Sequence, residues 1–365
     1  MIKKINLNCT IGNTGYGITS LNILKGLYQK NIDLSLFMIG NSAELNYPEE
    51  KAVIEELHNK KQLFDYNAPF LKIWHPNDLA YKIGKGHYYA LTFFELDTLS
   101  MGERHHLNYV DYIFVASKWG KEVLLNNGIK KPIYVAPLGV DLSIFAEKND
   151  IKIKDNYVFS HIGKWEKRKG QDFLIKCFEN AFDINDNVEL RLLPHNPFLN
   201  DQQLSEWLNL VNNSKLKDKI KIYKRLPTQY HLSEFIEQSD CCIFLSRAEG
   251  WNNEIPECMA LNKPIIATNY SAHTEYCDSN NSFLVDIDEL ELAYDQKWFY
   301  GQGKWAKLGD KEMEQTVDLM RMVYNKNITT NPNGVQTAHK YSWNNTVSII
   351  DETLTNNNSY ANSTN

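Results

Sequence analysis

At 365 residues and 42.3 kDa, the chain has the length of about two domains. Its 43% hydrophobic and 23% charged residues are typical of a globular protein, and its net charge of −6 disfavours nucleic acid as a partner. No apolar run approaches the ~20 residues that span a bilayer, and residues 1–12 predict a strand instead of a signal peptide. The six cysteines have no metal-ligand or disulfide spacing, which predicts reduced thiols in a cytoplasmic protein.

Apolar strand patterns alternate with amphipathic helix patterns along the first half of the chain. Strands are expected at 4–10, 34–40, 71–76, 88–94, 112–117 and 132–139, and helices at 20–30, 49–61 and 118–127. This alternation predicts an α/β domain at 1–150, with a parallel sheet covered by helices on both faces.

A polar segment at 146–155 indicates a linker, after which the alternation begins again. Strands are expected at 157–163, 187–194, 220–226, 241–246 and 264–270, and helices at 171–182, 204–213, 232–239, 255–262, 311–326 and 343–354. The pattern predicts a second α/β domain at 151–330, a C-terminal helical segment at 331–354 and a disordered polar tail at 355–365. In doubly wound sheets of this kind, ligands bind beyond the carboxyl ends of the strands.

The most informative stretch follows the predicted strand at 241–246. A turn that contains Gly250 leads into a helix, and Glu249 and Glu257 stand at either end of it, separated by seven residues. Backbone N–H groups at a strand-to-helix turn favour an anion such as a phosphate. A carboxylate at each end can hold hydroxyl groups, so the stretch predicts a sugar nucleotide as the ligand.

Residues 246–276 resemble the E-x7-E region of the retaining glycosyltransferases of family 4 (glycosyl transferases group 1), which have the GT-B fold. Three further segments resemble that family in its order: GNTGYG at 12–17, residues 111–145, and HIGKWEKRKGQDFLIKCF at 161–178. Each is weak alone, and the four together are specific. The resemblance covers about residues 5–350. It implies two Rossmann-like domains facing a central cleft, an acceptor domain and a nucleotide-sugar donor domain, and a C-terminal helix that returns to the first domain.

The loop at 161–172 places Lys164 and Lys169 five residues apart, just before a predicted helix. Two ammonium groups there can clamp a diphosphate and stabilise it as it leaves. The alternative is a solvated basic loop, and the presence of Glu249 and Glu257 in the same domain favours the functional interpretation. The family usually has Arg where this chain has Lys164, and Lys binds phosphate as a point charge without the bidentate geometry of Arg.

The resemblance also implies roles for individual donor-binding residues. Glu257 is expected to accept hydrogen bonds from the ribose hydroxyls, and Glu249 to lie beside the donor sugar. A flexible glycine loop is expected to close over the diphosphate, and the segment at 224–232 to line the nucleobase pocket. The complete expected set is Gly15, Gly17, Lys164, Lys169, Arg225, Leu226, Glu249, Gly250, Trp251, Asn252, Asn253 and Glu257.

Two of these segments differ from known sequence patterns: the turn at Asn252 and Asn253 differs from the family pattern, and the glycine run at 12–17 differs from a dinucleotide fingerprint. Asn252 and Asn253 stand where the family commonly has Gly and an apolar residue, which indicates a different backbone geometry, and Asn tolerates left-handed conformations better than most residues. The glycine run at 12–17 also lacks the acidic residue ~20 positions on that a dinucleotide fingerprint needs. Among the aromatic residues, Trp165 and Trp251 are the two expected to stack on a sugar.

TFFELD at 92–97 follows a predicted strand, which places Glu95 at a ligand-binding edge. Glu95 is therefore a candidate for contacting the sugar or for taking a proton from the acceptor hydroxyl. The alternative for this segment is that Asp97 caps a helix. His75 ends another strand, and an inverting transferase or a sugar-nucleotide epimerase would need Glu95 or His75 as its base.

These residues lead to the hypothesis of a retaining, metal-independent hexosyltransferase with Glu249, Lys169, Lys164 and Glu95 as catalytic residues. The donor would be a nucleoside diphosphate sugar and the acceptor a hydroxyl of a glycan or glycolipid, as in polysaccharide or lipopolysaccharide synthesis. No cofactor and no metal is expected, because lysines and helix N-termini supply the positive charge. A lipid-linked acceptor would bring the protein to the inner face of a membrane. The alternatives are an inverting GT-B transferase and a non-catalytic sugar-nucleotide or glycan-binding partner subunit.

Overall fold

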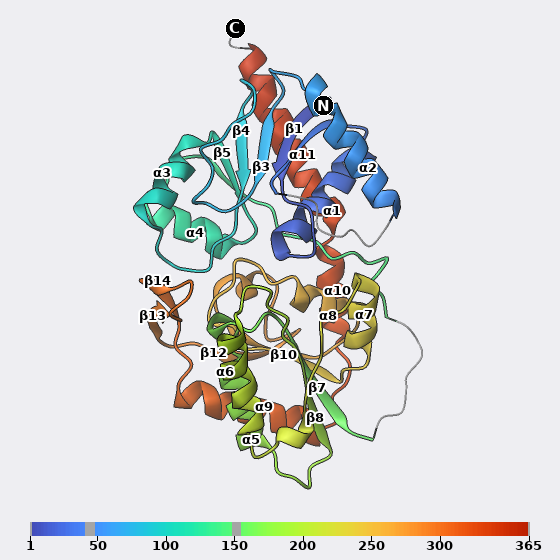
Figure 1. Ribbon diagram of the computed structural model, residues 1–365, viewed down its shortest axis with the longest axis vertical. Helices are drawn as coiled ribbons and strands as arrows, with labels where there is room; N and C mark the ends of the chain where they lie inside the picture. The colour runs from blue at the N-terminus through green and yellow to red at the C-terminus, as the bar shows by residue number, and fades with distance from the viewer. Residues whose placement is uncertain (1, 41–47, 148–154, 364–365) are drawn as a thin grey trace. The chain divides into compact units, whose positions relative to one another are not determined.

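The computed structural model describes residues 2–40, 48–147 and 155–363. The chain divides into two compact units (Figure 1). The first comprises Met1–Phe94, Thr98–Gly139 and Tyr341–Asn365, and the second comprises Glu95–Asp97 and Val140–Lys340. Each unit is built on a six-stranded parallel sheet with helices, which confirms the predicted α/β class.

The first sheet has the strand order β2-β1-β3-β4-β5-β6. Every residue of β3 and β4 is buried, because helices cover both faces of a parallel sheet. The strands are β1 (Lys4–Cys9), β2 (Asp33–Met38), β3 (Phe70–Ile73), β4 (Tyr88–Leu91), β5 (Tyr112–Val115) and β6 (Ile133–Val135). The helices are α1 (Gly15–Gln29), α2 (Pro48–Asn59), α3 (Met101–Tyr109), α4 (Lys118–Asn126) and α11 (Trp343–Ser363), with a 3-10 turn η1 (Lys60–Leu63).

The second sheet has the order β12-β11-β10-β7-β8-β9, and the order of its strands reverses between β7 and β10. Its strands are β7 (Tyr157–Ile162), β8 (Val188–Leu193), β9 (Ile220–Ile222), β10 (Cys241–Phe244), β11 (Ile265–Asn269) and β12 (Phe283–Asp286). Its helices are α5 (Gln171–Ala181), α6 (Asp201–Asn212), α7 (Gln229–Glu237), α8 (Glu254–Ala260), α9 (Asp310–Asn325) and α10 (Pro332–Lys340), with 3-10 turns η2 (Lys167–Lys169), η3 (Lys217–Lys219) and η4 (Ser271–Glu275).

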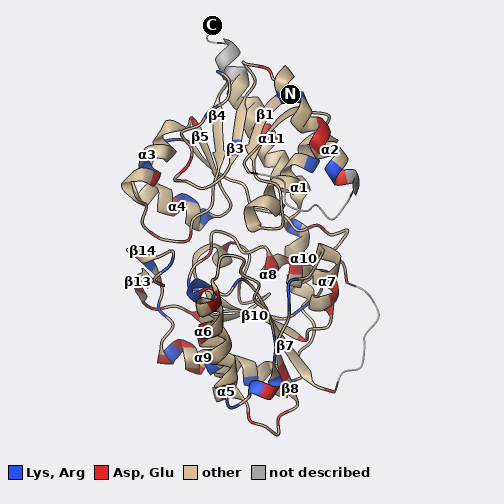
Figure 2. Ribbon diagram, viewed as in Figure 1, with Lys and Arg blue, Asp and Glu red and all other residues tan. Residues whose placement is uncertain are grey.

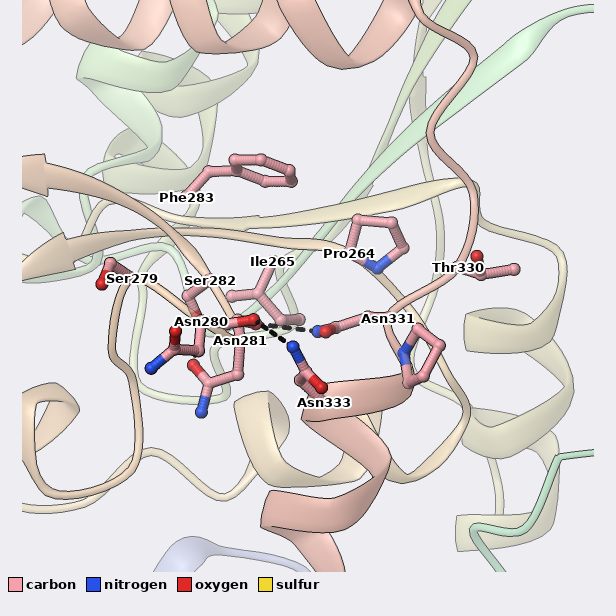
Figure 3. Close-up of a pocket in the computed structure, with 11 residues that line it drawn as sticks. Pro264, Ile265, Ser279, Asn280, Asn281, Ser282, Phe283, Thr330, Asn331 and Asn333 are labelled. Atoms are coloured by element: carbon pink, nitrogen blue, oxygen red, sulfur yellow. Dashed lines mark hydrogen bonds between the residues drawn. The ribbon is translucent and has the colours of Figure 1, made fainter.

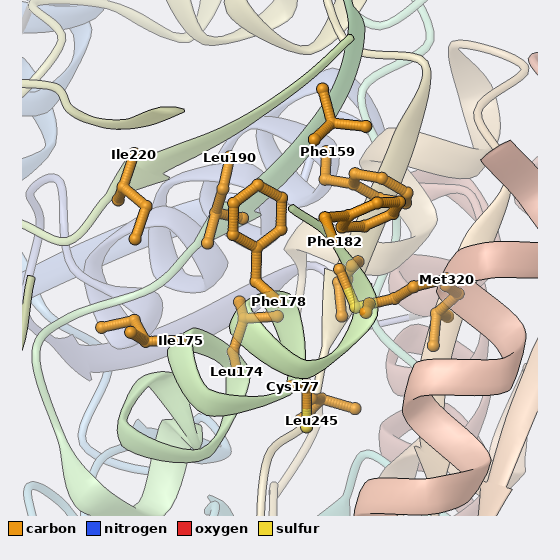
Figure 4. Close-up of a cluster of buried hydrophobic side chains, with 14 of the residues drawn as sticks. Phe159, Leu174, Ile175, Cys177, Phe178, Phe182, Leu190, Ile220, Leu245 and Met320 are labelled. Atoms are coloured by element: carbon orange, nitrogen blue, oxygen red, sulfur yellow. The ribbon is translucent and has the colours of Figure 1, made fainter. Parts of the chain in front are cut away.

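The core of the second unit forms where α5 packs on the centre of this sheet (Figure 4). Leu174 and Phe178 of α5 lie against Phe159 of β7 and Leu190 of β8, and all four are fully buried. Burial of a side chain such as Phe178 contributes ~1.5–3 kcal/mol to folding. This packing fixes the start of α5, and with it the loop that joins β7 to α5.

The C-terminal helix differs from the prediction in both position and length. The first part of the predicted segment, α10, belongs to the second unit, and only α11 joins the first unit. The expected disordered tail from 355 is wrong as far as Ser363, because α11 continues through it. Leu354 is buried and Thr355 accepts a hydrogen bond from the Ile2 backbone N–H at 3.3 Å, so tertiary contacts stabilise a helix that its polar composition does not favour.

The sequence-based prediction missed one helix, one edge strand and one antiparallel hairpin. The first is α3, although Ser100 and Glu103 form a capping box at its start. The others are the edge strand β12 and an antiparallel hairpin of β13 (Leu290–Tyr294) and β14 (Tyr300–Ala306). Within the described ranges, no helix is long and apolar enough to cross a membrane.

Candidate functional site

The candidate site lies where the strand order of the second sheet reverses. Strands β7 and β10 are adjacent and parallel, so the loops that follow them leave the sheet at the same edge. In doubly wound folds this reversal opens the crevice in which ligands bind. The loop after β7 carries Lys164 and Lys169, and the loop after β10 carries Glu249. Two segments that are about 80 residues apart in sequence are thus brought together.

Gly170 makes this close approach feasible. Its φ of 75° is a left-handed conformation, and a Cβ atom at this position would lie 2.0 Å from the carbonyl oxygen of Leu245, just beyond β10. Only a glycine allows the start of α5 to pack so tightly on the neighbouring strand.

Buried ion pairs join the two loops around the carboxylate of Glu249. Arg168 donates from Nη1 to Glu249 Oε2 at 2.6 Å, and Lys169 Nζ lies 2.7 Å from Oε1. Ser246 donates its hydroxyl to Oε1 at 2.8 Å. Arg168 also donates from Nη2 to Glu166 Oε2 at 2.8 Å, and Lys164 pairs with the other oxygen of Glu166 at 3.2 Å. The cluster therefore holds three cations against two carboxylates.

Each charge in this cluster is stabilised by its neighbours. Burial tends to raise the pKa of Glu249, but Arg168 and Lys169 hold that pKa well below its ordinary value. Burial also opposes the charge on Arg168, whose pKa is nevertheless raised by Glu249 and Glu166. The pKa of Glu166 is lowered, because Arg168 and Lys164 outweigh its burial. Glu249, Glu166 and Arg168 are consequently ionised at neutral pH.

The two lysines expected to clamp a diphosphate are in different situations. Lys169 is only 7% exposed and is paired with Glu249, whereas the Lys164 side chain is 42% exposed. Arg168, which joins the two carboxylates, was left out of the sequence-based set of site residues. Its position in the basic run at 164–169 was the available signal, but a charge run does not show which member is buried.

Glu257 presents the opposite electrostatic situation to Glu249. It lies in α8 and is 7% exposed, and within the described part of the chain its carboxyl group has no hydrogen-bond or ion-pair partner. Burial raises its pKa well above the ordinary value, and Glu254 and Asp141 raise it further. A ligand that brings hydroxyl donors would supply the hydrogen bonds that this carboxyl group does not receive from the described residues.

The turn between the two glutamates contains one residue in a left-handed conformation, which Asn adopts more readily than most residues. Asn252 has a φ of 86°, in the left-handed region. Its side-chain amide lies 3.0 Å from Nε2 of His273, whose pKa burial lowers to about 4, so the imidazole is neutral. His273 Nδ1 lies 3.1 Å from the carbonyl oxygen of Thr268 and can donate to it, which leaves Nε2 to accept from Asn252. His273 was not among the predicted residues.

The two tryptophans singled out for sugar stacking are core residues. Trp165 is 2% exposed and stacks on Trp207 with ring centroids 4.9 Å apart. Trp251 is 4% exposed and packs against Tyr276 at 4.8 Å. The expectation that their rings stack on a ligand is therefore wrong, because other side chains already cover them.

The glycine segment of the first unit is also different from the expected flexible loop. Gly15 and Gly17 lie in the first turn of α1, and Thr14 caps this helix by accepting from the Gly17 backbone N–H at 3.4 Å. A Cβ atom on Gly17 would lie 2.5 Å from the carbonyl oxygen of Gly12, whereas one on Gly15 would meet open space. The segment is a tightly packed start of a helix.

Further predicted residues lie in two other loops. Arg225 is exposed and Leu226 half-buried, between β9 and α7. Glu95 follows β4 and is counted with the second unit. Asp97 accepts a hydrogen bond from the Lys304 backbone N–H at 2.8 Å, and Ser100 caps α3, so the alternative of helix capping by Asp97 is wrong.

His75 is the other candidate base, and Asp286 and Asp288 are an acidic pair that could be considered for metal binding. His75 is exposed, with its ring centroid 4.5 Å from that of Tyr16. Asp286 and Asp288 form an Asp-x-Asp sequence, but Asp286 accepts from Asn269, and Asp288 is paired with Lys311. Among the described residues, no group of three or more His, Cys, Asp or Glu side chains is placed to hold a metal ion.

A separate pocket of about 280 Å³ lies at the opposite end of β11 from the Glu249 loop (Figure 3). Its amide groups are largely engaged within the protein, since Asn331 donates to the Asn281 carbonyl oxygen at 2.9 Å and Asn333 to that of Asn280 at 2.8 Å. Asn331 also caps α10 by accepting from the Gly334 N–H. The pocket is part of the packing of α10 and is remote from the candidate site.

Comparison with known proteins agrees with this geometry. Residues 156–296 match the family Glycosyl transferases group 1. The chain is 25% identical over 263 residues to a glycosyltransferase of Methanocaldococcus jannaschii (MJ1059), a match that covers 65% of this chain and 62% of the relative. It is 24% identical over 179 residues to the capsular polysaccharide biosynthesis glycosyltransferase CapM of Staphylococcus aureus, covering 48% and 44%. The chain thus spans less than two thirds of the length of these relatives.

Solved structures share the fold over nearly the whole chain. Sucrose-phosphate synthase from Thermosynechococcus elongatus superimposes with a TM-score of 0.72 at 13% identity, covering 98% of this chain and 100% of that one. Anabaena HepE, in complex with UDP and glucose, has a TM-score of 0.71 at 14% identity, covering 97% and 100%. The protein therefore has the GT-B fold of two Rossmann-like domains. Residues 156–296 match the model of the glycosyl transferases group 1, which agrees with the resemblance of the sequence segments to that group.

Proposed function

We propose that the protein is a retaining glycosyltransferase of the family 4 type, which transfers a hexose from a nucleoside diphosphate sugar to a hydroxyl of a glycan or glycolipid. The observation that carries the proposal is the contrast between two buried glutamates, Glu249 in the loop after β10 and Glu257 in the helix α8 that follows it. Glu249 is saturated by cations, while Glu257 has no partner among the described residues. The structure of HepE with UDP and glucose supports a uridine nucleotide as the first donor to test.

In this proposal the two glutamates hold different parts of the donor. The ribose hydroxyls donate to the Glu257 carboxyl group and so satisfy a buried group that has no protein donor. Glu249 is positioned by Arg168, Lys169 and Ser246, and it holds the sugar next to the same cations. Rigid placement of this kind contributes to catalysis because the reacting groups need no reorganisation.

The cationic cluster would stabilise the leaving diphosphate. Lys164, Arg168 and Lys169 lie together in this cluster, and the backbone N–H groups at the start of α5 lie beside them. As the bond between the anomeric carbon and the diphosphate oxygen breaks, negative charge develops on that oxygen, where the cluster can stabilise it. The acceptor oxygen forms the new bond, and Glu95 is the candidate to receive its proton.

The biosynthetic role and the cellular location expected for the protein follow from the acceptor. A glycan or lipid-linked acceptor fits polysaccharide or lipopolysaccharide synthesis in the cytoplasm, at the inner face of a membrane if the acceptor carries a lipid. The proposal involves no cofactor and no metal, since the cations of the chain supply the positive charge.

A second candidate function is a non-catalytic sugar-nucleotide or glycan binder. The observation that favours it is the pairing of Lys169 with Glu249, because a lysine held by a carboxylate is less available to a diphosphate. A binder of this kind would bind a donor without transferring or hydrolysing it.

A thermal-shift screen against UDP-, GDP-, ADP- and dTDP-sugars, with and without EDTA, tests the proposal. A ligand at about 100 times its Kd adds ~2.7 kcal/mol of stability. We expect one nucleotide series to raise the Tm regardless of EDTA, and the shift to be smaller in Lys164→Ala and Glu257→Gln. The donor that binds is then assayed for transfer and slow hydrolysis. Binding without either reaction supports the non-catalytic candidate, and the absence of any shift contradicts both.

A further inference from the structure

His161 is a fully buried histidine near the carboxyl end of β7, and the mechanism proposed above assigns it no part. Its Nδ1 lies 2.7 Å from the carbonyl oxygen of Ile243 in the neighbouring strand β10. Because a carbonyl oxygen can only accept, Nδ1 carries the proton of this hydrogen bond. Burial lowers the pKa of His161 to about 4, so the ring is neutral and Nε2 presents a lone pair.

The lone pair of His161 Nε2 is not engaged in the structure. The atom is shielded from solvent and has no hydrogen-bond partner among the residues that the structure describes. Buried polar atoms in folded proteins nearly always have a partner, and an unpaired one is destabilising. Nε2 is therefore suited to receive a donor from a neighbouring side chain that can change its direction.

The side chain of Lys169 passes beside this nitrogen. A Cβ atom on Gly163 would lie 3.2 Å from His161 Nε2, and 3.3 Å and 3.6 Å from Cδ and Cε of Lys169. The imidazole nitrogen and the end of the lysine side chain thus border the same space, which Gly163 leaves open. The positive charge of Lys169 also acts to lower the pKa of His161, in agreement with this proximity. Rotation about the last bonds of the lysine side chain changes the direction of its ammonium group.

In the structure, Glu249 holds the ammonium group of Lys169, with Nζ 2.7 Å from Oε1. The same oxygen accepts from the Ser246 hydroxyl at 2.8 Å, and Oε2 accepts from Arg168 at 2.6 Å. Glu249 would therefore keep a cation and a hydroxyl donor if Lys169 turned away. Basic and acidic residues are interspersed over the second unit (Figure 2), so the charge that a phosphate meets depends on local pairings of this kind.

We propose that Lys169 exchanges partners when a diphosphate binds: its ammonium group leaves Glu249, donates to a phosphate oxygen and donates a second hydrogen bond to His161 Nε2. An ammonium group has three N–H donors, so it can serve both acceptors at once. The acceptor at His161 lowers the cost of separating Lys169 from Glu249, and the freed Oε1 can accept from a hydroxyl of the donor sugar. His161 is then a positioning residue that acts through Lys169. The part of this exchange in sugar transfer rests on the proposed function, whereas the exchange on binding of a diphosphate does not.

The test is calorimetry of the purified full-length protein with inorganic pyrophosphate and with UDP. His161→Asn keeps a donor near the position of Nδ1 and removes the acceptor at Nε2, whereas His161→Gln places an acceptor near Nε2 again. We expect His161→Asn to raise the Kd for both probes about tenfold, as for loss of one hydrogen bond to a charged group, and His161→Gln to recover most of that loss. His339→Asn, at an exposed histidine of α10, is the control and should leave both Kd values unchanged.

A double-mutant cycle with Lys169→Met separates positioning from support of the fold. If His161 acts through Lys169, His161→Asn should have little further effect on pyrophosphate binding once the ammonium group is gone. A loss of the same size in both backgrounds would show a purely structural role and would overturn the inference. As a second measurement, the ¹⁵N resonance of Nε2 should move when the wild-type protein is saturated with pyrophosphate, because the lone pair then accepts a hydrogen bond.

The exchange would be contradicted by equal affinity of wild type and His161→Asn for both probes, or by an Nε2 resonance that pyrophosphate leaves in place. Binding of neither probe by the wild-type protein would contradict it as well. Pyrophosphate binding with the expected coupling, together with no response to any sugar nucleotide in the thermal-shift screen, would contradict the proposed function and leave the exchange of partners standing.

Discussion

Arg168 and Glu249 form the central contact between the two loops of the candidate site, with Arg168 Nη1 2.6 Å from Glu249 Oε2. Both side chains are less than a tenth exposed, and Arg168 also neutralises Glu166. An arginine can satisfy two carboxylates at once because its guanidinium group presents several donors in a fixed plane. The contact holds the loop after β7 against the loop after β10, and so it positions every other charge of the site.

Removal of Arg168 should strongly destabilise the protein. Arg168→Ala leaves two buried carboxylates short of a cation, and breaking a buried pair in this way costs about 3–5 kcal/mol. Urea denaturation would measure the loss in the free energy of unfolding. The matched control is Lys167→Ala, whose side chain belongs to the same turn but bonds only to a backbone carbonyl oxygen, and it should change stability by less than ~1 kcal/mol. Equal losses in both variants would contradict a special role for the buried pairs.

The contribution of Glu249 to stability should depend on pH. Its pKa is lower in the folded than in the unfolded protein, where it is ~4.3. Its ionic stabilisation is therefore present above pH ~4.3 and is lost as the pH falls from there toward the lower folded pKa. We expect the difference in free energy of unfolding between wild type and Glu249→Gln to be constant from pH 6 to 8 and to shrink below pH ~4.3. A difference that grows on acidification would be inconsistent with the depressed pKa.

Replacement of Glu257 should have opposite effects on stability and on binding. Its pKa is raised in the folded protein, so ionisation costs stability as the pH rises above the unfolded value of ~4.3. Glu257→Gln should therefore be at least as stable as the wild type at pH 7, with an advantage that falls on acidification. Replacement of a carboxyl oxygen by an amide NH2 group removes an acceptor for the ribose hydroxyls and should weaken donor binding about tenfold or more. Unfolding curves at pH 5 and pH 8 and calorimetry with the donor would measure the two effects. A variant that is less stable and binds normally would contradict both.

Adjacent asparagines of the Glu249 loop should respond differently to substitution. Asn252 is left-handed with a φ of 86°, whereas Asn253 has an ordinary φ of −60°. Asn252→Ala should lose about 1–2 kcal/mol through backbone strain in addition to its lost bond to His273. Asn252→Gly should recover part of that loss because glycine adopts this conformation freely. Thermal unfolding would compare both with Asn253→Ala, and no recovery in the glycine variant would show that strain is unimportant here.

Packing of α11 on α1 should depend on the lack of a side chain at Gly26. A Cβ atom there would lie 2.5 Å from Val347 Cγ2, whereas one at Gly15 of the same helix would meet nothing within 4 Å. Gly26→Ala should destabilise the protein by about 1–3 kcal/mol through overpacking, and the additional change Val347→Ala should relieve part of the loss. Gly15→Ala is the control, for which chemical denaturation should show little change. Full stability of Gly26→Ala would indicate that α11 packs elsewhere.

The fold was largely predictable because hydrophobic patterns report local periodicity. The central strands β7 and β10 are buried along their whole length, and β10 is a continuous apolar run while β7 begins with one. Hairpin strand β13 was missed because its apolar residues alternate over only five positions and face solvent on one side. The extension of α11 was missed because its polar residues indicate disorder, and only contacts with the first unit stabilise the helix.

The sequence by itself determined the doubly wound class of both domains and the positions of the two loops that carry the site, since strand periodicity and the spacing of Glu249 and Glu257 are local properties. Tertiary structure alone decided which charges meet: Arg168 and Lys169 pair with Glu249, whereas Glu257 lacks a partner among the described residues. It also decided that Trp165 and Trp251 are buried and that Tyr294 and Tyr300 are exposed. The physical reason is that burial and ion pairing depend on neighbours from distant parts of the chain, and only the packed structure brings those neighbours together.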